Sequence, residues 1–552
     1  MTFELGGYRA AVDRGLVEAR DQHLARRLWQ RDHTLWQPDP AEIANRLGWL
    51  DCPTVMADRV EEIAGFVDEV RRAGYTRALL LGMGGSSLAP EVFRTTFGVA
   101  DGHLDLAVLD STEPRTVHDR IAASDPATTL YVVSTKSGGT VETHSLFLRC
   151  YREVVAALGR DAAGAHFAAI TDPGSRLETL AGELGFRHTF RNDPEIGGRY
   201  SALSYFGLVP AALVGVDLGR LLARSQDAAA HCRGAEDNPG VALGNALGEL
   251  ARAGRDKLTL LLPEPLAGFG DWVEQLVAES MGKRGKGILP VVGEQPGAPD
   301  AYGADRVFAV FGETGDAEAL AAAGHPVLRL PLQEPYDLGY QFFLWEVATA
   351  VAGTRLGVNP FDQPDVESAK VRAQEMVAAY REAGTLPSPP PTLECDGVGI
   401  WAEFPVGGAR DALTRFLGQA RPGDYLAVHA YLPPDGATDA ALGELRLGAR
   451  RRSHLAVTVG YGPRFLHSTG QLHKGDRGNG LFLQLTCDPQ ARVSIPDGPD
   501  TDASSLGFET LIAAQALGDR QALLDAGRRV LRLHLGAAPL ARIVELATAM
   551  GD

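Results

Sequence analysis

The sequence of 552 residues contains few cysteines, and their arrangement suits neither a metal site nor a disulfide framework. The five cysteines lie far apart, their number is odd, and no two of them form a CxxC pair. This usage favours a reducing compartment, so we predict a cytoplasmic protein without a bound metal. No apolar run approaches the roughly 18 residues of a membrane helix, and the amino terminus has no apolar signal-peptide core.

Positive charge is also scarce. The chain has 53 Lys and Arg residues against 70 Asp and Glu, a formal net charge of −17 and a pI near 5.3. Such a negative surface repels nucleic acid and anionic membranes, which argues against both as partners. An anionic substrate would therefore need local basic groups and backbone dipoles. The length, with 45% apolar and 22% charged residues, predicts a globular protein of several domains.

The first candidate binding loop lies in residues 79–90, which read LLLGMGGSSLAP. The apolar end of a predicted strand is followed by Gly82, Gly84 and Gly85, and then by two serines before a helix. Such a turn leaves backbone N–H groups unpaired, and the helix dipole adds positive charge, so the turn suits an anion. An ordinary packing turn has the same pattern. Because the GxGxxG and Walker spacings are absent, we predict no nucleotide site.

A second loop, in residues 130–143, makes phosphate or phosphosugar binding the better interpretation. The sequence LYVVSTKSGGTVET again runs from an apolar strand into a loop rich in hydroxyl groups, with Lys136 as its one cation. Hydroxyls and backbone N–H groups donate to phosphate oxygens, and small residues allow close approach. A solvated turn that caps a helix is the alternative.

The order of apolar runs predicts an α/β fold. Residues 1–75 read as helices, whereas strands alternate with helices over residues 76–225 and again over 226–385, which predicts two doubly wound parallel-sheet lobes. The proline-rich stretch 386–391 marks a domain boundary. Beyond it, residues 392–552 form an additional C-terminal α/β section. Its three predicted strands lie in DYLAVHAYLPP, SHLAVTVGYGP and GLFLQLTCD, and its final segment, FETLIAAQALGDRQALLDAGRRVLRLHL, has helical periodicity.

The two loops resemble the phosphate-binding segments of the sugar isomerase (SIS) fold, and specifically of the phosphoglucose isomerase family. Three more specific motifs support the narrower family: GGRYSALS in residues 197–204, EQLVAESMGKRGKG in 274–287 and NPFDQPDVESAK in 359–370. The resemblance covers roughly two thirds of the chain. It implies two SIS-type lobes and an aldose–ketose isomerase that interconverts glucose 6-phosphate and fructose 6-phosphate without a cofactor.

Isomerisation through an enediol needs a carboxylate base and positive charge near the developing enediolate. Our candidate base is Glu279, which shares a helix face with Gln275, four residues earlier and a predicted substrate contact. An exposed surface glutamate is the alternative. By resemblance, Arg199 stabilises the enediolate, Lys370 lies near the ring oxygen and Gln363 contacts the substrate. The phosphate contacts implied in the same way are Gly85, Ser86, Thr135, Ser137 and Thr140, with Lys136 ordering its loop or adding charge.

One family feature is missing. The family carries a histidine that assists ring opening, in a GQHAF context between the glutamate and lysine motifs. This chain has LGYQFFLWEVATAVAG there, with Tyr340 and Gln341 at the expected place. We therefore predict that Lys370 opens the ring alone or that the C-terminal section supplies His473, from TGQLHK. A surface histidine is the alternative interpretation of His473.

The missing histidine and the extra section resemble the isomerase half of bifunctional transaldolase/phosphoglucose isomerase proteins. The sequence has no room for an eight-fold barrel, so we expect no transaldolase activity in this chain. The sequence leaves open whether the protein acts with a separate transaldolase partner and whether it forms a homodimer. Two other functions are an isomerase of another anionic hexose, such as mannose 6-phosphate or a sulfonated sugar, and a sugar-phosphate sensor without turnover. Glu279, Arg199 and Lys370 together argue against a sensor, because binding needs only the hydroxyl-rich loops.

Overall fold

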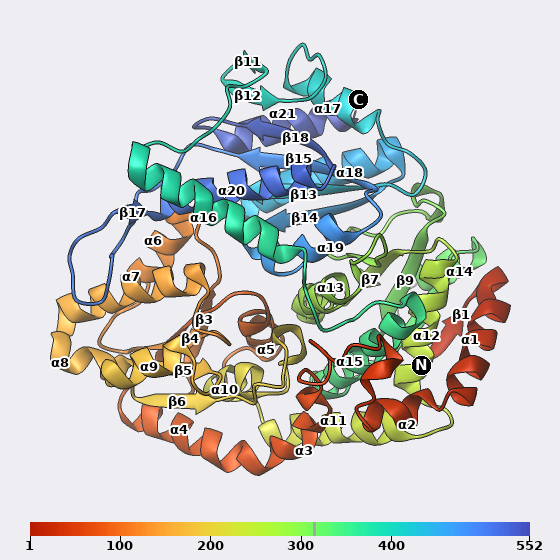
Figure 1. Ribbon diagram of the computed structural model, residues 1–552, viewed down its shortest axis with the longest axis horizontal. Helices are drawn as coiled ribbons and strands as arrows, with labels where there is room; N and C mark the ends of the chain where they lie inside the picture. The colour runs from red at the N-terminus through yellow and green to blue at the C-terminus, as the bar shows by residue number, and fades with distance from the viewer. Residues whose placement is uncertain (313–315, 552) are drawn as a thin grey trace.

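The computed structural model describes residues 1–312 and 316–551, which form three α/β units (Figure 1). In Figure 1 the first unit lies at the lower left, the second at the right and the C-terminal unit above both. Each unit has a sheet with parallel strands covered by helices. The predicted α/β class with parallel sheets is therefore confirmed.

The first unit contains a five-stranded, fully parallel sheet in the order β3-β2-β4-β5-β6. Since β2 and β4 are neighbours, the loops that follow them lie side by side at the carboxyl edge, where ligands of such sheets bind. The strands are β2 (Arg77–Leu81), β3 (Asp105–Leu109), β4 (Thr129–Ser134), β5 (Phe167–Thr171) and β6 (His188–Arg191). The helices are α4 (Val60–Arg72), α5 (Leu88–Phe97), α6 (Pro114–Ala122), α7 (Val141–Leu158), α8 (Arg160–Ala163), α9 (Arg176–Glu183) and α10 (Tyr205–Leu213).

The second unit contains a sheet in the order β1-β10-β9-β7-β8, in which only β1 is antiparallel to its neighbour among the described strands. The strands expected within residues 226–385 are present as β7 (Lys257–Leu261), β8 (Leu289–Val291), β9 (Arg306–Phe311) and β10 (Val327–Leu330). The helices are α11 (Leu218–Arg233), α12 (Pro239–Arg252), α13 (Ala267–Met281), α14 (Asp316–Ala322) and α15 (Asp337–Leu356).

The amino-terminal segment is not wholly helical, which corrects the prediction for residues 1–75. Its first element is β1 (Thr2–Glu4), which pairs with β10 across more than 300 residues of sequence. A three-residue strand is too short to show a period of two, so this pairing is visible only in the fold. The helices that follow are α1 (Arg9–Asp21), α2 (Leu24–Trp29) and α3 (Cys52–Val55).

The C-terminal unit contains a six-stranded sheet in the order β11-β12-β18-β15-β13-β14, parallel from β18 to β14. The three predicted strands are present, but the final segment is not one helix. Gly527, at φ +70°, ends α20, and the following residues form β18. The strands are β11 (Leu393–Cys395), β12 (Val398–Trp401), β13 (Tyr425–Tyr431), β14 (Ala456–Tyr461), β15 (Gly480–Thr486) and β18 (Arg529–His534), beside a hairpin of β16 (Ser494–Ile495) and β17 (Leu506–Gly507). The helices are α17 (Ala409–Leu417), α18 (Gly436–Ser453), α19 (Gly470–Gly475), α20 (Phe508–Asp525) and α21 (Pro539–Gly551).

Helix α16 (Val366–Ala383), which carries Lys370, packs against α20 of the C-terminal unit. It lies within the range predicted for the second lobe. The two helices approach closely at Gly518, where an added Cβ would lie 2.7 Å from the backbone nitrogen of Ala373. The C-terminal unit therefore holds a helix that the sequence places before the proline-rich boundary.

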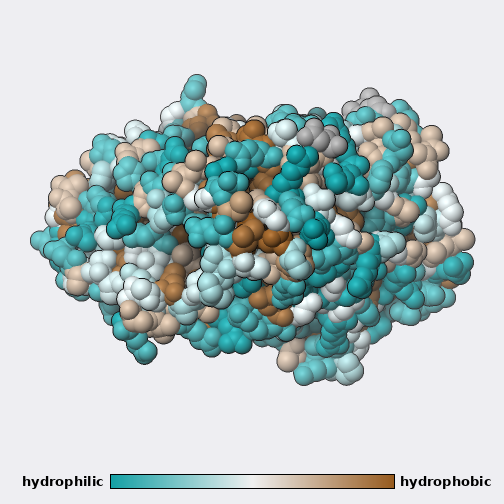
Figure 2. Space-filling model, turned by 90° about the horizontal axis from the view of Figure 1, so that it is seen from above, coloured by the Kyte–Doolittle hydropathy of each residue, from teal (hydrophilic) through white to brown (hydrophobic). Residues whose placement is uncertain are grey.

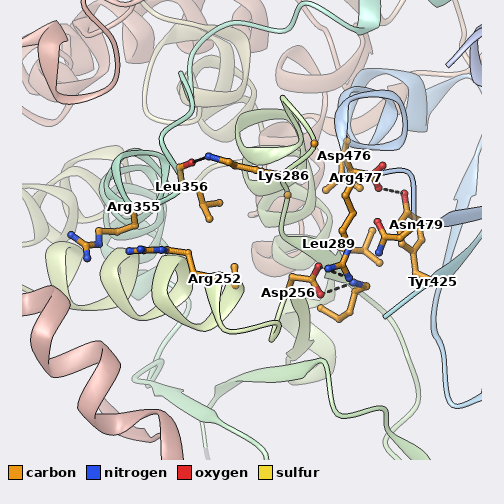
Figure 3. Close-up of a pocket in the computed structure, with 15 residues that line it drawn as sticks. Arg252, Asp256, Lys286, Leu289, Arg355, Leu356, Tyr425, Asp476, Arg477 and Asn479 are labelled. Carbon is orange, nitrogen blue, oxygen red and sulfur yellow. Dashed lines mark hydrogen bonds and ion pairs between the residues drawn. The ribbon is translucent and has the colours of Figure 1, made fainter. Parts of the chain in front are cut away.

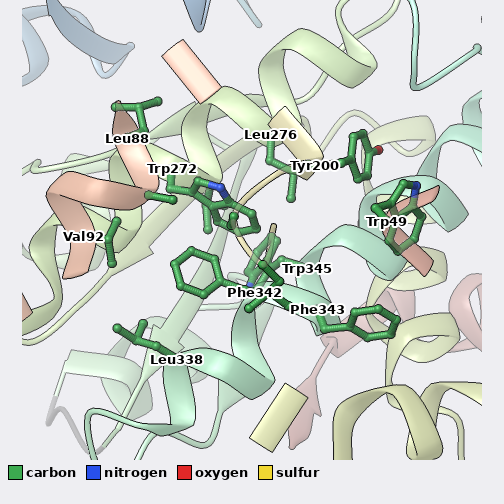
Figure 4. Close-up of a cluster of buried hydrophobic side chains, with 14 of the residues drawn as sticks. Trp49, Leu88, Val92, Tyr200, Trp272, Leu276, Leu338, Phe342, Phe343 and Trp345 are labelled. Carbon is green, nitrogen blue, oxygen red and sulfur yellow. The ribbon is translucent and has the colours of Figure 1, made fainter. Parts of the chain in front are cut away.

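Helix α13 is buried over most of its length, and its apolar residues pack inside the protein. Its Trp272 meets Phe342 of α15 edge to face, with ring centroids 4.7 Å apart. Figure 4 shows Trp272 and Leu276 turned toward Phe342, with Trp49 and Tyr200 stacked to one side. Such aromatic packing fixes α13 in position and leaves its polar residues for another face.

The surface is mainly hydrophilic in the view of Figure 2, with apolar atoms gathered in small areas near the middle. In the described chain the largest exposed apolar side chains are scattered and include Val17, Val55 and Val544. Among residues 1–312 and 316–551, no helix combines the length and apolar character needed to cross a membrane.

The contact between α13 and the C-terminal unit makes a testable prediction at Gly282. An added Cβ would lie 2.2 Å from the Cα of Leu472 in α19, so Gly282→Ala must push the two units apart. We expect it to lower the free energy of unfolding by about 1–3 kcal/mol. The control Gly65→Ala, on α4 with no atom within 4 Å, should instead stabilise the protein by about 0.5–1 kcal/mol. Denaturant unfolding measures both, and an unchanged stability of Gly282→Ala would contradict the described seam.

Candidate functional site

The two glycine- and hydroxyl-rich loops meet at the carboxyl edge of the first sheet. The loop after β2 contacts the GGRYS turn so closely that a Cβ on Gly85 would lie 2.0 Å from the carbonyl oxygen of Gly198. The neighbouring loop is joined to it by Ser134, whose Oγ donates to the carbonyl of Ser86 at 3.2 Å. Helices α5 and α7 begin directly after these loops, so both present backbone N–H groups and positive dipole ends to the same region.

The second loop is ordered by its own side chains. Thr135 Oγ1 lies 3.3 Å from Thr140 Oγ1, and Ser137 Oγ accepts from the N–H of Gly139. Lys136 Nζ contacts Asp172 Oδ2 at 2.5 Å and donates to the carbonyl of Pro194 at 2.7 Å. Lys136 therefore ties its loop to the adjacent strand end.

Arg199 brings three motifs together. This buried side chain donates from Nε to Ser280 Oγ at 2.9 Å and from Nη1 to Gln363 Oε1 at 3.0 Å. Its Nη1 also lies 3.2 Å from Glu279 Oε1. A buried guanidinium must be paired to offset its desolvation, so these contacts constrain the carboxylate as well as the arginine.

Gln275 and Glu279 share one face of α13, as their spacing predicts. Gln275 Nε2 donates to Glu279 Oε2 at 3.2 Å and to the backbone carbonyl of His467 at 2.7 Å. An added Cβ on Gly84 would lie 2.8 Å from the same Nε2. One oxygen of Glu279 thus faces Arg199 and the other faces Gln275, beside the first loop.

The turn that carries Gln363 is held by two cations. Lys283 Nζ donates to the carbonyls of Asn359 at 2.6 Å and Asp362 at 2.5 Å, and Arg199 Nη2 donates to the carbonyl of Pro360 at 2.7 Å. Burial, with the nearby charge of Arg199, lowers the pKa of Lys283 to about 7. The cations therefore position Gln363 next to the base.

A cavity of about 860 Å³ lies between the second loop, α16 and the C-terminal unit. Ser137, Thr140 and Glu142 line it from the second loop and the start of α7, Lys370 lines it from α16, and His467 lines it from the C-terminal unit. This size is typical of a small-molecule site. The described structure thus brings the second loop, Lys370 and His467 to one cavity. The predicted residues Arg199, Gln275, Glu279 and Gln363 do not line it, although Gln275 donates to the backbone carbonyl of His467 at its edge.

His467 is the functional residue that sequence reasoning missed. Its Nε2 lies 3.0 Å from Glu142 Oε1, and the two side chains are mostly buried. Burial raises the pKa of Glu142, but the charge and hydrogen bond of His467, with the charge of Lys370, outweigh it and lower that pKa. The carboxylate and histidine therefore form an acid–base pair inside the cavity. The motif RFLHSTGQLHK contains this signal, but it does not show which histidine faces the loops.

His473, the histidine predicted to help open the ring, lies elsewhere. It is 2% exposed, and its Nδ1 lies 3.2 Å from His429 Nε2. The rings of Tyr425 and Phe482 pack around it, and burial lowers its pKa well below the usual value. In the described structure the turn ending at His467 faces the cavity, whereas the helix carrying His473 faces the C-terminal sheet.

A second cavity of about 330 Å³ lies at the seam between α12, α15 and the C-terminal unit (Figure 3). Its cations are engaged: Lys286 donates to the carbonyl of Leu356 at the end of α15, and Arg477 lies 3.3 Å from Asp256. Cations at helix carboxyl ends offset the helix dipole. These contacts give Lys286 and Arg477 structural roles. The predicted catalytic residues do not line this cavity.

Comparisons with known proteins agree with this geometry. A family model described as phosphoglucose isomerase matches residues 56–287. A glucose-6-phosphate isomerase of Rubrobacter xylanophilus is 30% identical over 419 residues, which cover 65% of this chain and 94% of the relative. One of Thermus thermophilus is 30% identical over 438 residues, which cover 68% and 98%. A solved hypothetical protein from Thermus thermophilus is 27% identical with a TM-score of 0.56, covering 67% of this chain and 97% of that chain.

Glu274 of α13 makes a prediction about pH. Burial and the charge of Asp271 raise its pKa from 4.5 to about 8, so between these values the folded protein holds a proton that the unfolded chain has lost. Stability must therefore fall as pH rises across this window. Glu274→Gln cannot ionise, and we expect it to lose less stability than the wild type between about pH 5 and about pH 8.5.

Thermal unfolding at the two pH values measures this difference, with the exposed Glu61→Gln on α4 as the control expected to follow the wild type. Parallel loss of stability in Glu274→Gln and wild type would show that Glu274 is already ionised in the fold.

Proposed function

Because the chain belongs to the phosphoglucose isomerase family, we propose that it interconverts glucose 6-phosphate and fructose 6-phosphate. The observation that carries this proposal is the placement of Glu279 between Arg199 and Gln275, next to two anion-binding loops. A site that only binds sugar phosphate needs the loops but gains nothing from a carboxylate held against a buried guanidinium. A homodimer and a separate transaldolase partner stay predictions from the resemblance.

The phosphate is assigned to the two loops of the first unit. Ser86, Thr135, Ser137 and Thr140 supply hydroxyl groups, and the starts of α5 and α7 supply backbone N–H groups. Close approach at Gly85 requires the absence of a side chain. The net charge of −17 makes this local donor set necessary for an anionic substrate.

Ring opening is assigned to the Glu142–His467 pair. The reaction transfers a proton from the anomeric hydroxyl to the ring oxygen, and an imidazole can accept the one proton and deliver the other. Glu142 Oε1 lies 3.0 Å from His467 Nε2 and orients the ring. Lys370, lining the same cavity, adds positive charge beside the ring. We assign this role to His467 in place of His473, which is packed inside the C-terminal unit.

Proton transfer follows in the open chain. Glu279 removes the proton from C2 of glucose 6-phosphate, which gives a cis-enediolate, and a hydroxyl proton moves from O2 to O1. Glu279 then returns its proton to C1, and fructose 6-phosphate results. Arg199 stabilises the negative charge that develops on the enediol oxygens, and its fixed contacts mean that it need not reorganise.

The base is tested with Glu279→Gln, which keeps the shape of the side chain. We expect kcat for isomerisation to fall about 10²–10⁴-fold, the contribution of a general base. Exchange between the two anomers of glucose 6-phosphate needs ring opening and closing only, so this variant should keep it. A coupled assay measures the first rate and NMR exchange spectroscopy the second. Undiminished isomerisation would remove Glu279 from the mechanism.

Matched variants distinguish the roles of His467 and His473. His467→Gln should lose isomerisation and anomer exchange together, by about 10²-fold or more, because the ring no longer opens on the protein. His473→Gln should lose stability through its buried contacts and keep both rates per folded molecule. The opposite pattern, with exchange lost only in His473→Gln, would return the ring-opening role to His473.

A further inference from the structure

We propose that Gln515 of α20 is a positioning residue for ring opening, which holds Glu142 as the acceptor that His467 faces. The inference rests on the proposed function, because it concerns the same acid–base pair. It also gives the C-terminal unit a second role in the site, beyond supplying His467.

The Gln515 amide is buried and has both ends engaged. Its Nε2 donates to Glu142 Oε1 at 2.8 Å, and its Oε1 accepts from Thr112 Oγ1 at 2.6 Å. The oxygen of Glu142 that accepts from Gln515 is also the one 3.0 Å from His467 Nε2. One carboxylate oxygen therefore contacts both the Gln515 amide and the His467 ring.

This arrangement sets where the proton lies. The nitrogen of a side-chain amide donates and cannot accept, so Gln515 favours Glu142 as the carboxylate over the protonated acid. The proton shared by the pair is therefore favoured on His467. Thr112 donates to the amide oxygen of Gln515, and a flipped amide would set that oxygen against Glu142 Oε1. The hydrogen bonds from Thr112 to Gln515 and from Gln515 to Glu142 therefore run in one direction and meet the His467 contact at the same carboxylate oxygen.

The charged groups around the pair support the same state. Glu142 feels the charges of His467 and of Lys370, both of which lower its pKa. Lys370 lies on α16, and α16 packs on the helix that carries Gln515. The C-terminal unit thus supplies His467 and Gln515 directly and supports Lys370 through α16.

Gln484 provides a matched control. It is also a buried glutamine of the C-terminal unit, and its Nε2 donates to the carbonyl of Ala516 in α20 at 2.9 Å. It therefore supports the same helix as Gln515, at the next residue, but it donates to the backbone and not to the acid–base pair. Loss of this glutamine disturbs packing of α20 without removing a contact to Glu142.

The test compares Gln515→Leu, Gln484→Leu and wild type as full-length proteins, with anomer exchange of glucose 6-phosphate and isomerisation of fructose 6-phosphate as the two rates. We expect Gln515→Leu to lower both rates about 10- to 100-fold, the effect of one lost hydrogen bond to a charged group. The KM for fructose 6-phosphate should change little, because the phosphate loops are intact. The pH at which anomer exchange reaches half its maximum should also shift. Gln484→Leu should keep both rates and this pH.

A second variant covers failure of Gln515→Leu to fold. Gln515→Glu keeps the shape but sets an acid against Glu142, so anomer exchange should fall as pH rises and the new acid ionises. Unchanged exchange in either folded variant, or exchange lost equally in Gln484→Leu, would overturn the role of Gln515. Wild type that neither exchanges anomers nor isomerises would instead overturn the proposed function itself.

Discussion

The buried guanidinium of Arg199 is the interaction on which the rest of the site depends. Its donors reach Ser280, Gln363, two carbonyls of the turn before Gln363, and the carboxylate of Glu279. A cation so far from water is tolerated only when its hydrogen bonds are satisfied. The segments that carry these acceptors therefore pack around the guanidinium. Helix α13, the GGRYS turn and the NPFDQ turn therefore meet at Arg199. The charge placed there by the fold is the charge that an enediolate requires.

The C-terminal unit completes this centre from the other side. It inserts the turn that ends at His467 between the second loop and α13, and the carbonyl of the same residue orients Gln275. Gln471 of α19 makes a second connection between the C-terminal unit and the site. It donates to the carbonyl of Gly282 after α13, and it exchanges hydrogen bonds with Asp365 at the start of α16. In the proposed mechanism His467 takes the place of the missing family histidine, from a different part of the same chain.

Much of the site could be predicted from local sequence, and the limit has a physical cause. Strand–loop–helix patterns located both phosphate loops, and a spacing of four placed Gln275 beside Glu279, because these relations depend on neighbouring residues. His467 was missed because the choice between it and His473 depends on which turn meets α13, a contact across some 190 residues. The strands β1 and β18 were missed for the same reason: each is defined by a partner strand far along the chain.

The central claim is that a carboxylate of this chain carries a proton between two carbons, and solvent isotope incorporation tests it most directly. A proton held by Glu279 can exchange with water before it returns to carbon, whereas a hydride that moves directly between C2 and C1 cannot. Glucose 6-phosphate is incubated with the protein in D2O and recovered for NMR. The account predicts deuterium at C2 that accumulates with wild type and not with Glu279→Gln. Isomerisation without deuterium in substrate or product would contradict it.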